Sequence, residues 1–241
     1  MTAAVGVVVP AHNEEDLLPR CLAAVRRAER ALGGIPVHLV VAADACSDRT
    51  AELAREAKAA VVETGARCVG AARAAGMREV LRLTGHLDPS SVWLATTDAD
   101  TLVPPDWLRM QLAYAAAGWD AVVGTVLVTD WSEHSPAVRR LFEQRYGDST
   151  DTHSHVHGAN LGFTVRAYLA AGGFGPLPTA EDHALVQSLT AAGGRIARTG
   201  QISVATSARR AARAPLGFGH LLTTLTGALG TGPCQIPVCR H

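Results

Sequence analysis

The chain has 241 residues, 48% of them hydrophobic, which is enough to bury one sizeable core or two small ones. Lys and Arg together number 22, as do Asp and Glu, so no overall field attracts nucleic acid and an anionic partner has to be recognised locally. Five cysteines without a C-x-x-C pair favour a reduced, cytoplasmic protein over a disulfide or metal framework.

The sequence also bears on membrane insertion. Met1 leads directly into a strand-like segment, without the basic and apolar regions of a signal peptide. No uninterrupted apolar segment reaches the roughly 18 residues of a membrane span. We therefore expect no transmembrane segment, although the protein could still work at a membrane surface.

Apolar runs alternate with amphipathic segments through the first half of the sequence. Residues 5–9 are continuously apolar and largely β-branched, typical of a strand buried on both faces in a parallel sheet, and Pro10 is expected to end it. A helix is expected from Glu15 to Gly33-Gly34, with Pro19 in its first turn. Further strands are expected at 37–41, 61–62 and 92–97, and further helices after a cap at Ser47 or Asp48 and over 71–83.

In the second half we expect a helix over 106–117, a strand over 121–128, and helices over 136–146 and 181–192. The pattern is looser beyond Thr129, and the Gly- and Thr-rich tail from Pro215 has no firm periodicity. The alternation of strands and helices predicts a doubly wound α/β sheet with helices on both faces. In such sheets, ligands gather beyond the carboxyl ends of the strands.

Two acidic side chains follow the apolar run at 92–97. Asp98 and Asp100 are spaced i and i+2, so both can bind one divalent ion, and an anionic diphosphate can complete its coordination. An Asp-x-Asp motif alone is common. Its meaning depends on whether the rest of the chain builds a nucleotide site around it.

Three more polar segments fall near the ends of predicted strands, at 10–14, 44–48 and 70–73. If the sheet is parallel, they converge with the Asp pair on one edge. There, carboxylates and Asn13 can hydrogen-bond a base and a ribose, and Arg73 can face a phosphate. The alternative is ordinary loop chemistry, with Asn13 and Asp48 as helix caps and Glu14 as a partner of a helix dipole.

This ordered set of motifs resembles family 2 glycosyltransferases, which have the GT-A fold. The resemblance covers roughly residues 5–190. It implies a single Rossmann-like, mostly parallel sheet that forms one domain over 1–214, with a nucleotide-sugar-binding half at 1–103, an acceptor half at 104–214, and a tail at 215–241. The matching segments are Pro10-x-x-Asn13-Glu14, Asp44…Ser47-Asp48-x-Thr50, Gly70-x-x-Arg73-x-x-Gly76, Asp98-Ala99-Asp100, residues 158–163, residues 172–174 and Glu181-Asp182-x-x-Leu185.

The resemblance also implies a reaction and a role for each matching position. A sugar would pass from a nucleotide-diphospho-sugar to a hydroxyl of a small molecule, a saccharide or a lipid-linked acceptor. Asp100 would be the principal ligand of Mg²⁺ or Mn²⁺, and Asp98 would contact the ribose or a metal-bound water. The remaining donor contacts would be Pro10, His12, Asn13 and Glu14 at the base and ribose, Asp44 at the base, Arg73 near the base or diphosphate, and Ala99 between the two acids.

Asp182 would be the general base of an inverting reaction. The leaving diphosphate needs charge stabilisation, which a metal supplies as a Lewis acid, and the attacking hydroxyl must lose its proton. Asp182 sits where a helix is expected to begin, and the helix dipole favours its ionised form. Glu181 is the neighbouring rival, and the simplest alternative is that both residues merely start a helix.

The sequence departs from the family in two respects. The family often has two acidic residues where this chain has Ala43-Asp44, and the Gln-x-x-Arg-Trp motif of processive synthases is missing, which favours a single-transfer enzyme. One alternative is a sugar nucleotidyltransferase, which would need a Gly-rich phosphate loop that residues 10–14 do not provide. Another is a non-catalytic nucleotide-sugar-binding protein.

Three further features allow more than one interpretation. His153, His155 and His157 alternate, so in a strand all three side chains would point to one face and could bind one metal ion. The alternatives are that they contact the acceptor or a phosphate, or that this stretch is a plain loop. Trp107 is expected in the core or at its rim, with sugar stacking as the alternative. The arginines between 195 and 213 form either a solvated face or a flexible segment that closes over the donor diphosphate or meets an anionic acceptor. Attraction to a membrane surface that carries a lipid-linked acceptor is a weaker alternative, and His220 could add a metal ligand after closure.

Overall fold

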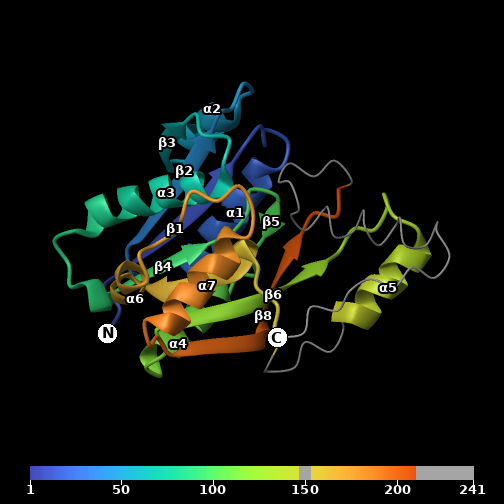
Figure 1. Cartoon of the computed structure of the whole chain (residues 1–241). Helices are drawn as coiled ribbons and strands as arrows, with labels where there is room; N and C mark the ends of the chain where they lie inside the picture. The colour runs from blue at the N-terminus through green and yellow to red at the C-terminus, as the bar shows by residue number, and fades with distance from the viewer. Residues whose placement is uncertain (147–152, 210–241) are drawn as a thin grey trace.

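The structure is a computed structural model, and it describes residues 1–146 and 153–209. One eight-stranded sheet runs through these residues in the order β3-β2-β1-β4-β7-β6-β8-β5 (Figure 1). The strands are β1 (Ala4–Ala11), β2 (Val37–Asp44), β3 (Ala60–Thr64), β4 (Val92–Thr96), β5 (Thr101–Leu102), β6 (Ala121–Val128), β7 (Leu161–Thr164) and β8 (Ile196–Thr206).

Helices cover both faces of the sheet. Val5, Val7 and Val9 of β1 pack in the core layer of α1, α2 and α4, whereas Val8 packs in the layer of α3, α6 and α7. Helix α5 lies to the side of the other helices (Figure 1), but its Val138 and Phe142 pack in the same core layer as α1, α2 and α4. The helices are α1 (Leu18–Arg30), α2 (Thr50–Glu56), α3 (Val69–Thr84), α4 (Trp107–Ala116), α5 (Pro136–Tyr146), α6 (Val165–Ala170), α7 (Glu181–Ala191), and the 3₁₀ turns η1 (Pro89–Ser91) and η2 (Gly158–Asn160).

The pairing of the strands confirms the predicted α/β class. Strands β3, β2, β1 and β4 are parallel to one another, and β6 is parallel to β8. The pairs β4–β7, β6–β7 and β5–β8 are antiparallel. Because β4 pairs with β7, the two predicted halves share one sheet. The division into those halves stays a prediction, and the predicted tail at 215–241 lies outside the described residues.

Glycines let α3 lie against the sheet and against a later loop. A Cβ on Gly76 would lie 2.4 Å from a methyl carbon of Val8 in β1, and a Cβ on Gly70 would lie 2.3 Å from the carbonyl oxygen of Gly175. Gly70, Arg73 and Gly76 are three residues apart, so they share one face of the helix. The face that carries Arg73 is therefore held against the interior.

Two predicted boundaries near the first strand are wrong. β1 continues through Pro10 to Ala11, and β4 pairs only with Ala4–Val8, so beyond Val8 the strand tolerates a residue without an N–H. Helix α1 begins at Leu18 rather than Glu15, because residues 15–17 form a turn in which the Leu18 N–H donates to the carbonyl of Glu14. Pro19 lies in the first turn, as predicted.

The predictions are weakest after Thr129. The short β7 and α6 were not predicted, and part of the arginine-containing region forms β8, a strand in which buried residues alternate with more exposed ones. Residues 153–157 form no strand. No helix within 1–146 and 153–209 is both long and apolar enough to cross a bilayer.

Candidate active site

The predicted segments at 10–14 and 44–48 contact each other at the carboxyl ends of β1 and β2. His12 Nδ1 lies 2.6 Å from the backbone oxygen of Asp44, and the Ser47 N–H donates to Asn13 Oδ1 at 2.7 Å. Asn13 and Ala45 both have left-handed backbone conformations, with φ of 52° and 50°. These contacts fix the loop that was predicted to hold the base and ribose, and Pro10 is buried beneath it.

Asp44 is buried and its carboxylate already has protein partners. It accepts hydrogen bonds from the Thr64 hydroxyl (2.8 Å) and from the backbone N–H groups of Arg67 (3.1 Å) and Cys68 (2.7 Å). Burial alone would raise the pKa of Asp44, but these hydrogen bonds overcome it and lower the pKa. Asp44 is thus an ionised acceptor in the predicted nucleoside site, and its contact with the base stays a prediction.

Asp98 and Asp100 follow β4 and are separated by the buried Ala99. Asp98 Oδ1 accepts a hydrogen bond from Arg73 Nη2 at 2.6 Å, and the Asp98 backbone oxygen accepts one from the Cys21 thiol at 3.3 Å. Asp100 Oδ2 lies 3.3 Å from Arg209 Nη2. Each carboxylate is therefore oriented by an arginine from a different part of the chain.

The two acids fit a hard divalent cation. Burial, together with the nearby Asp98 carboxylate, raises the pKa of Asp100 to about 7, which marks a carboxylate whose negative charge is poorly compensated. Among the described residues, no three His, Cys, Asp or Glu side chains are grouped to hold a metal ion. A cation on the Asp pair would thus need oxygen ligands from elsewhere, and Mg²⁺ commonly takes them from water and substrate phosphates.

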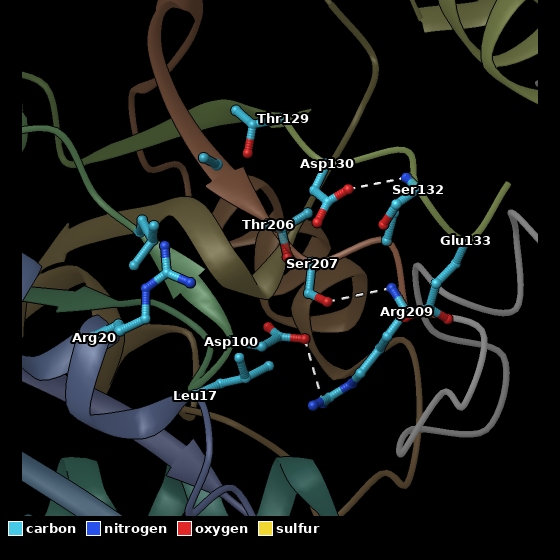
Figure 2. A pocket seen from close by; sticks show the side chains of 13 residues that line it. Leu17, Arg20, Asp100, Thr129, Asp130, Ser132, Glu133, Thr206, Ser207 and Arg209 are labelled. Carbon is cyan, nitrogen blue, oxygen red and sulfur yellow. Dashed lines mark hydrogen bonds and ion pairs between the residues drawn. The ribbon is translucent and has the colours of Figure 1, made fainter. Parts of the chain in front are cut away.

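A cavity of about 200 Å³ opens beside Asp100 (Figure 2). Residues of α1, β5, β8 and the segments at 129–133 and 207–209 line it. Arg209 extends back to Asp100 in this view and also forms a two-pronged ion pair with the buried Glu14. The basic C-terminal region thus supplies at least one side chain to the site, while the arginines at 210 and 213 and His220 lie outside the described residues.

The carboxylates of the two halves meet at Arg73. Its Nε donates to Glu181 Oε1 at 3.0 Å, its Nη1 to the Thr96 hydroxyl at 2.6 Å, and its Nη2 to Asp98. Arg73 is only 2% exposed. The structure thus places it inside a buried ion-pair network, and its predicted contact with the base or diphosphate remains untested.

Glu181 and Asp182 start α7, as predicted, but their environments differ. Glu181 is buried against Arg73, and burial raises its pKa although the guanidinium opposes the shift. Asp182 is partly exposed, and its Oδ2 accepts the backbone N–H of Gly158 at 2.7 Å. Asp182 is therefore the acid that a substrate can reach. Ala180, just before the pair, has a left-handed conformation with φ of 57°.

The alternating histidines lie side by side although no strand forms there. The ring of His155 stacks 6.0 Å from His153 and 6.2 Å from His157. Burial lowers the pKa of His157 to about 4, although Asp182 and Asp98 oppose the shift, so its imidazole is neutral at pH 7. Among residues 153–157 and the rest of the described chain, no three His, Cys, Asp or Glu side chains are grouped to hold a metal ion, which argues against a metal site at these histidines.

Trp107 belongs to the core. It has no exposed surface, and its indole N–H donates to Asn160 Oδ1 at 2.9 Å. The alternative of sugar stacking by Trp107 is therefore wrong.

Two residues of the site could not be recognised from the sequence, Gly158 and Thr96. Only the fold brings Gly158 to Asp182 and Thr96 to Arg73.

Comparisons of the fold point to one class of protein. The S. aureus protein TarS (residues 1–349) superposes with a TM-score of 0.62 at 13% identity, over 85% of this chain and 61% of TarS. A second match is glucosyl-3-phosphoglycerate synthase from Mycobacterium tuberculosis, in complex with Mn²⁺, UDP and glucosyl-3-phosphoglycerate. It superposes with a TM-score of 0.57 at 17% identity, over 94% of this chain and 78% of the synthase chain. At such identities the likeness shows the fold alone, which is the predicted GT-A fold.

The sequence comparisons define the family. Residues 6–169 match the model of the family described as glycosyl transferase family 2, so the chain belongs to that family. It is 37% identical to undecaprenyl-phosphate 4-deoxy-4-formamido-L-arabinose transferase of Pectobacterium carotovorum subsp. carotovorum (strain PC1), over 51% of this chain and 36% of that protein. The transferase of the same name from Pseudomonas fluorescens (strain Pf0-1) is 31% identical, over 68% of this chain and 46% of that protein. These matches span between about a third and a half of the length of the relatives.

Proposed function

We propose that this chain transfers a sugar from a nucleotide-diphospho-sugar to an acceptor oxygen, with Asp98 and Asp100 as ligands of Mn²⁺ or Mg²⁺. One observation carries the proposal. A single buried guanidinium, that of Arg73, contacts both Asp98 and Glu181, the neighbour of Asp182. This shared contact supports one site in which the Asp pair would bind the cation and Asp182 would face the acceptor, as a transferase requires.

On the donor side, the Asp pair would bind the cation and the loop at 10–14 would hold the nucleoside together with Asp44. A bound Mn²⁺ or Mg²⁺ supplies Lewis-acid stabilisation of the leaving diphosphate. The structural neighbour from M. tuberculosis was solved with Mn²⁺ and UDP, which supports this choice of cation and of nucleotide class.

On the acceptor side, Asp182 would act as the general base. A bond forms between the acceptor oxygen and the anomeric carbon on the face opposite the bond that breaks, so the configuration inverts. The nucleoside diphosphate leaves with the electron pair of the broken C–O bond, and the hydroxyl proton passes to Asp182. The Gly158 N–H at 2.7 Å orients the carboxylate for this step.

A second acceptor class is favoured by the relatives. Their name identifies undecaprenyl phosphate as their substrate. A phosphate monoester with a second pKa of about 6 is largely ionised at pH 7. Its oxygen would attack the anomeric carbon without a base. For such an acceptor, Asp182 would not be needed to accept a proton.

The test is to incubate the full chain with a panel of UDP-, GDP- and dTDP-sugars and Mn²⁺. Each donor is offered glycerol or a monosaccharide as hydroxyl acceptor, or vesicles that contain undecaprenyl phosphate. Nucleotide release, the glycosylated product and its anomeric configuration by NMR are measured. We expect release that requires Mn²⁺ or Mg²⁺ and stops with EDTA, and an inverted product. Metal-independent release, or no turnover of any donor, would contradict the proposal.

Asp182→Asn distinguishes the two acceptor classes. With a hydroxyl acceptor, we expect this variant to lose transfer while it still binds Mn²⁺ and UDP. With undecaprenyl phosphate, we expect it to retain most of its turnover. Loss with both acceptors would show that Asp182 has a role beyond proton removal.

A further inference from the structure

We infer that Arg73 is a positioning residue that couples the cation-binding side of the site to the acceptor side. The inference rests on the proposed function, because it assigns Arg73 a role between the two halves of that reaction. It differs from a nucleotide contact, in which Arg73 would touch the donor itself. Three observations carry it.

The first is that each nitrogen of the guanidinium donates a hydrogen bond within the protein. Nε, Nη1 and Nη2 donate to Glu181, Thr96 and Asp98 respectively, at 3.0, 2.6 and 2.6 Å. The Phe174 ring lies 5.9 Å from its central carbon. Arg73 is only 2% exposed, so a donor phosphate could reach it only if the surrounding groups moved. The rigid, planar fork of arginine holds partners in three directions at once, which a lysine ammonium cannot reproduce.

The second observation is that Arg73 touches the residue that holds Asp182. A Cβ on Gly158 would lie 2.3 Å from Arg73 Nη2 and 2.8 Å from its Cζ, so the guanidinium packs directly against the Gly158 backbone. The N–H of Gly158 donates to Asp182 Oδ2 at 2.7 Å. A shift of the guanidinium would therefore move the group that orients Asp182.

The third observation concerns how Arg73 itself is held. Gly70 and Gly76 lie one turn before and after it on α3, and each has a backbone or side-chain neighbour closer than a Cβ would allow. The Gly70 N–H also donates to the carbonyl of Leu177 at 3.1 Å. The helix thus fixes the position of Arg73 against both β1 and the loop that precedes α7.

The main experiment compares Arg73→Lys with Arg82→Lys. Arg82 lies on the same helix, pairs with Glu79 and is 68% exposed, so it controls for the substitution itself. Binding of Mn²⁺ with UDP is measured by EPR titration, and acceptor-dependent turnover is compared with acceptor-free donor hydrolysis. For Arg73→Lys we expect a loss of about tenfold or more in Mn²⁺ affinity and in the transfer-to-hydrolysis ratio, as for partners behind metal ligands. Arg82→Lys should match the wild type.

A second variant serves if Arg73→Lys does not fold. In Gly158→Ala the new methyl group would push the guanidinium away and disturb the N–H that holds Asp182. We expect this variant to lower the transfer-to-hydrolysis ratio by about tenfold or more. Where both variants fold, their combination should cost less than the sum of the two effects in free energy, because the residues act as one unit.

Two results would overturn the inference. If the variants only unfold at lower temperature, and bind Mn²⁺ and transfer like the wild type well below that temperature, Arg73 is merely structural. If Arg73→Lys raises only the KM for the donor, Arg73 is a nucleotide contact. A wild type that neither binds Mn²⁺ with UDP nor transfers would instead overturn the proposed function, and the inference with it.

Discussion

The guanidinium of Arg209 pairs with the carboxylate of Glu14 across 195 positions of sequence. The antiparallel pairing of β5 with β8, in which Thr101 lies opposite Thr206, brings the segment of Arg209 beside that of Asp100. The same guanidinium lies 3.3 Å from Asp100. A positive charge thus lies between the acid predicted to contact the ribose and the acid predicted to bind the cation.

Arg209→Ala should destabilise the protein in EDTA and increase its response to Mn²⁺. Glu14 is 5% exposed, and removal of the arginine leaves a buried carboxylate without that charge partner. We expect a loss of about 2 kcal/mol, or about 5 °C in the unfolding midpoint. Mn²⁺ should then raise the midpoint by more than in the wild type, because the cation takes over the compensation.

Thermal unfolding with and without Mn²⁺ checks this prediction. Arg195→Ala is the matched control, because Arg195 directly precedes β8 and stacks over Trp119 at 5.0 Å, away from Asp100. Its response to Mn²⁺ should equal that of the wild type. An equal response in Arg209→Ala would mean that Arg209 does not neutralise the cation-binding acids.

Asp100→Ala should abolish the stabilisation by Mn²⁺ without loss of the fold. Burial and Asp98 raise the pKa of Asp100 to about 7, so its charge is unfavourable in the folded protein and its removal costs little. Asp106→Ala is the control, since Asp106 is an exposed partner of Arg109 just before α4. EPR titration with Mn²⁺ should show binding in Asp106→Ala only. Wild-type affinity in Asp100→Ala would rule out Asp100 as the principal ligand.

The sequence predicted the strands that are buried on both faces. Residues 5–9 and 121–128 are valine-rich runs, and both are strands because a sheet covered by helices selects such runs. β8 escaped prediction because Arg198 and Gln201 interrupt its apolar residues and its pairing partners, β6 and β5, are far away in sequence. β5 is only two residues long, too short for any periodicity.

The sequence predicted the part of the candidate site that lies at the ends of parallel strands. The segments at 10–14 and 44–48 and the Asp pair follow parallel strands, so their position at one edge follows from topology. The direction of the Arg73 side chain does not follow from topology, because it depends on how Gly70 and Gly76 of α3 pack. The pairing of Arg209 with Glu14 depends on β8, which the sequence did not reveal.

Asp182→Asn and Glu181→Gln should have different effects. Asp182 is partly exposed whereas Glu181 is buried against Arg73. With a hydroxyl acceptor, Asp182→Asn should lower transfer by about 100-fold or more, the usual scale for loss of a general base, and calorimetry should show unchanged binding of UDP with Mn²⁺. Glu181→Gln should retain transfer but lower the free energy of unfolding by about 1–2 kcal/mol.

The outcome that contradicts this assignment is an inactive Glu181→Gln together with an active Asp182→Asn. That result would make Glu181 the base, in spite of its burial. Unfolding in urea separates the two effects, since a loss of activity without a loss of stability cannot come from the ion pair with Arg73 alone.

Asn160→Ala should cause a large loss of stability. The Asn160 side chain is 1% exposed; it accepts the indole N–H of Trp107 and donates to the carbonyls of Thr125 and Ile202, each at 2.9 Å. Alanine removes the acceptor of a buried indole N–H and one donor from each of the two carbonyls, so we expect a loss of about 3 kcal/mol in the free energy of unfolding. Urea unfolding measures it.

Gln187→Ala, at an exposed position of α7, should change the free energy of unfolding by less than about 0.5 kcal/mol. Asn160→Asp adds a sharper comparison, because it keeps an acceptor for Trp107 but loses the amide donors to β6 and β8. If Asn160→Asp is as stable as the wild type, those two donors do not hold η2 to the sheet. A stability at or below that of Asn160→Ala is the expected result, because the introduced carboxyl group puts a second buried oxygen against these two carbonyls, which repel it.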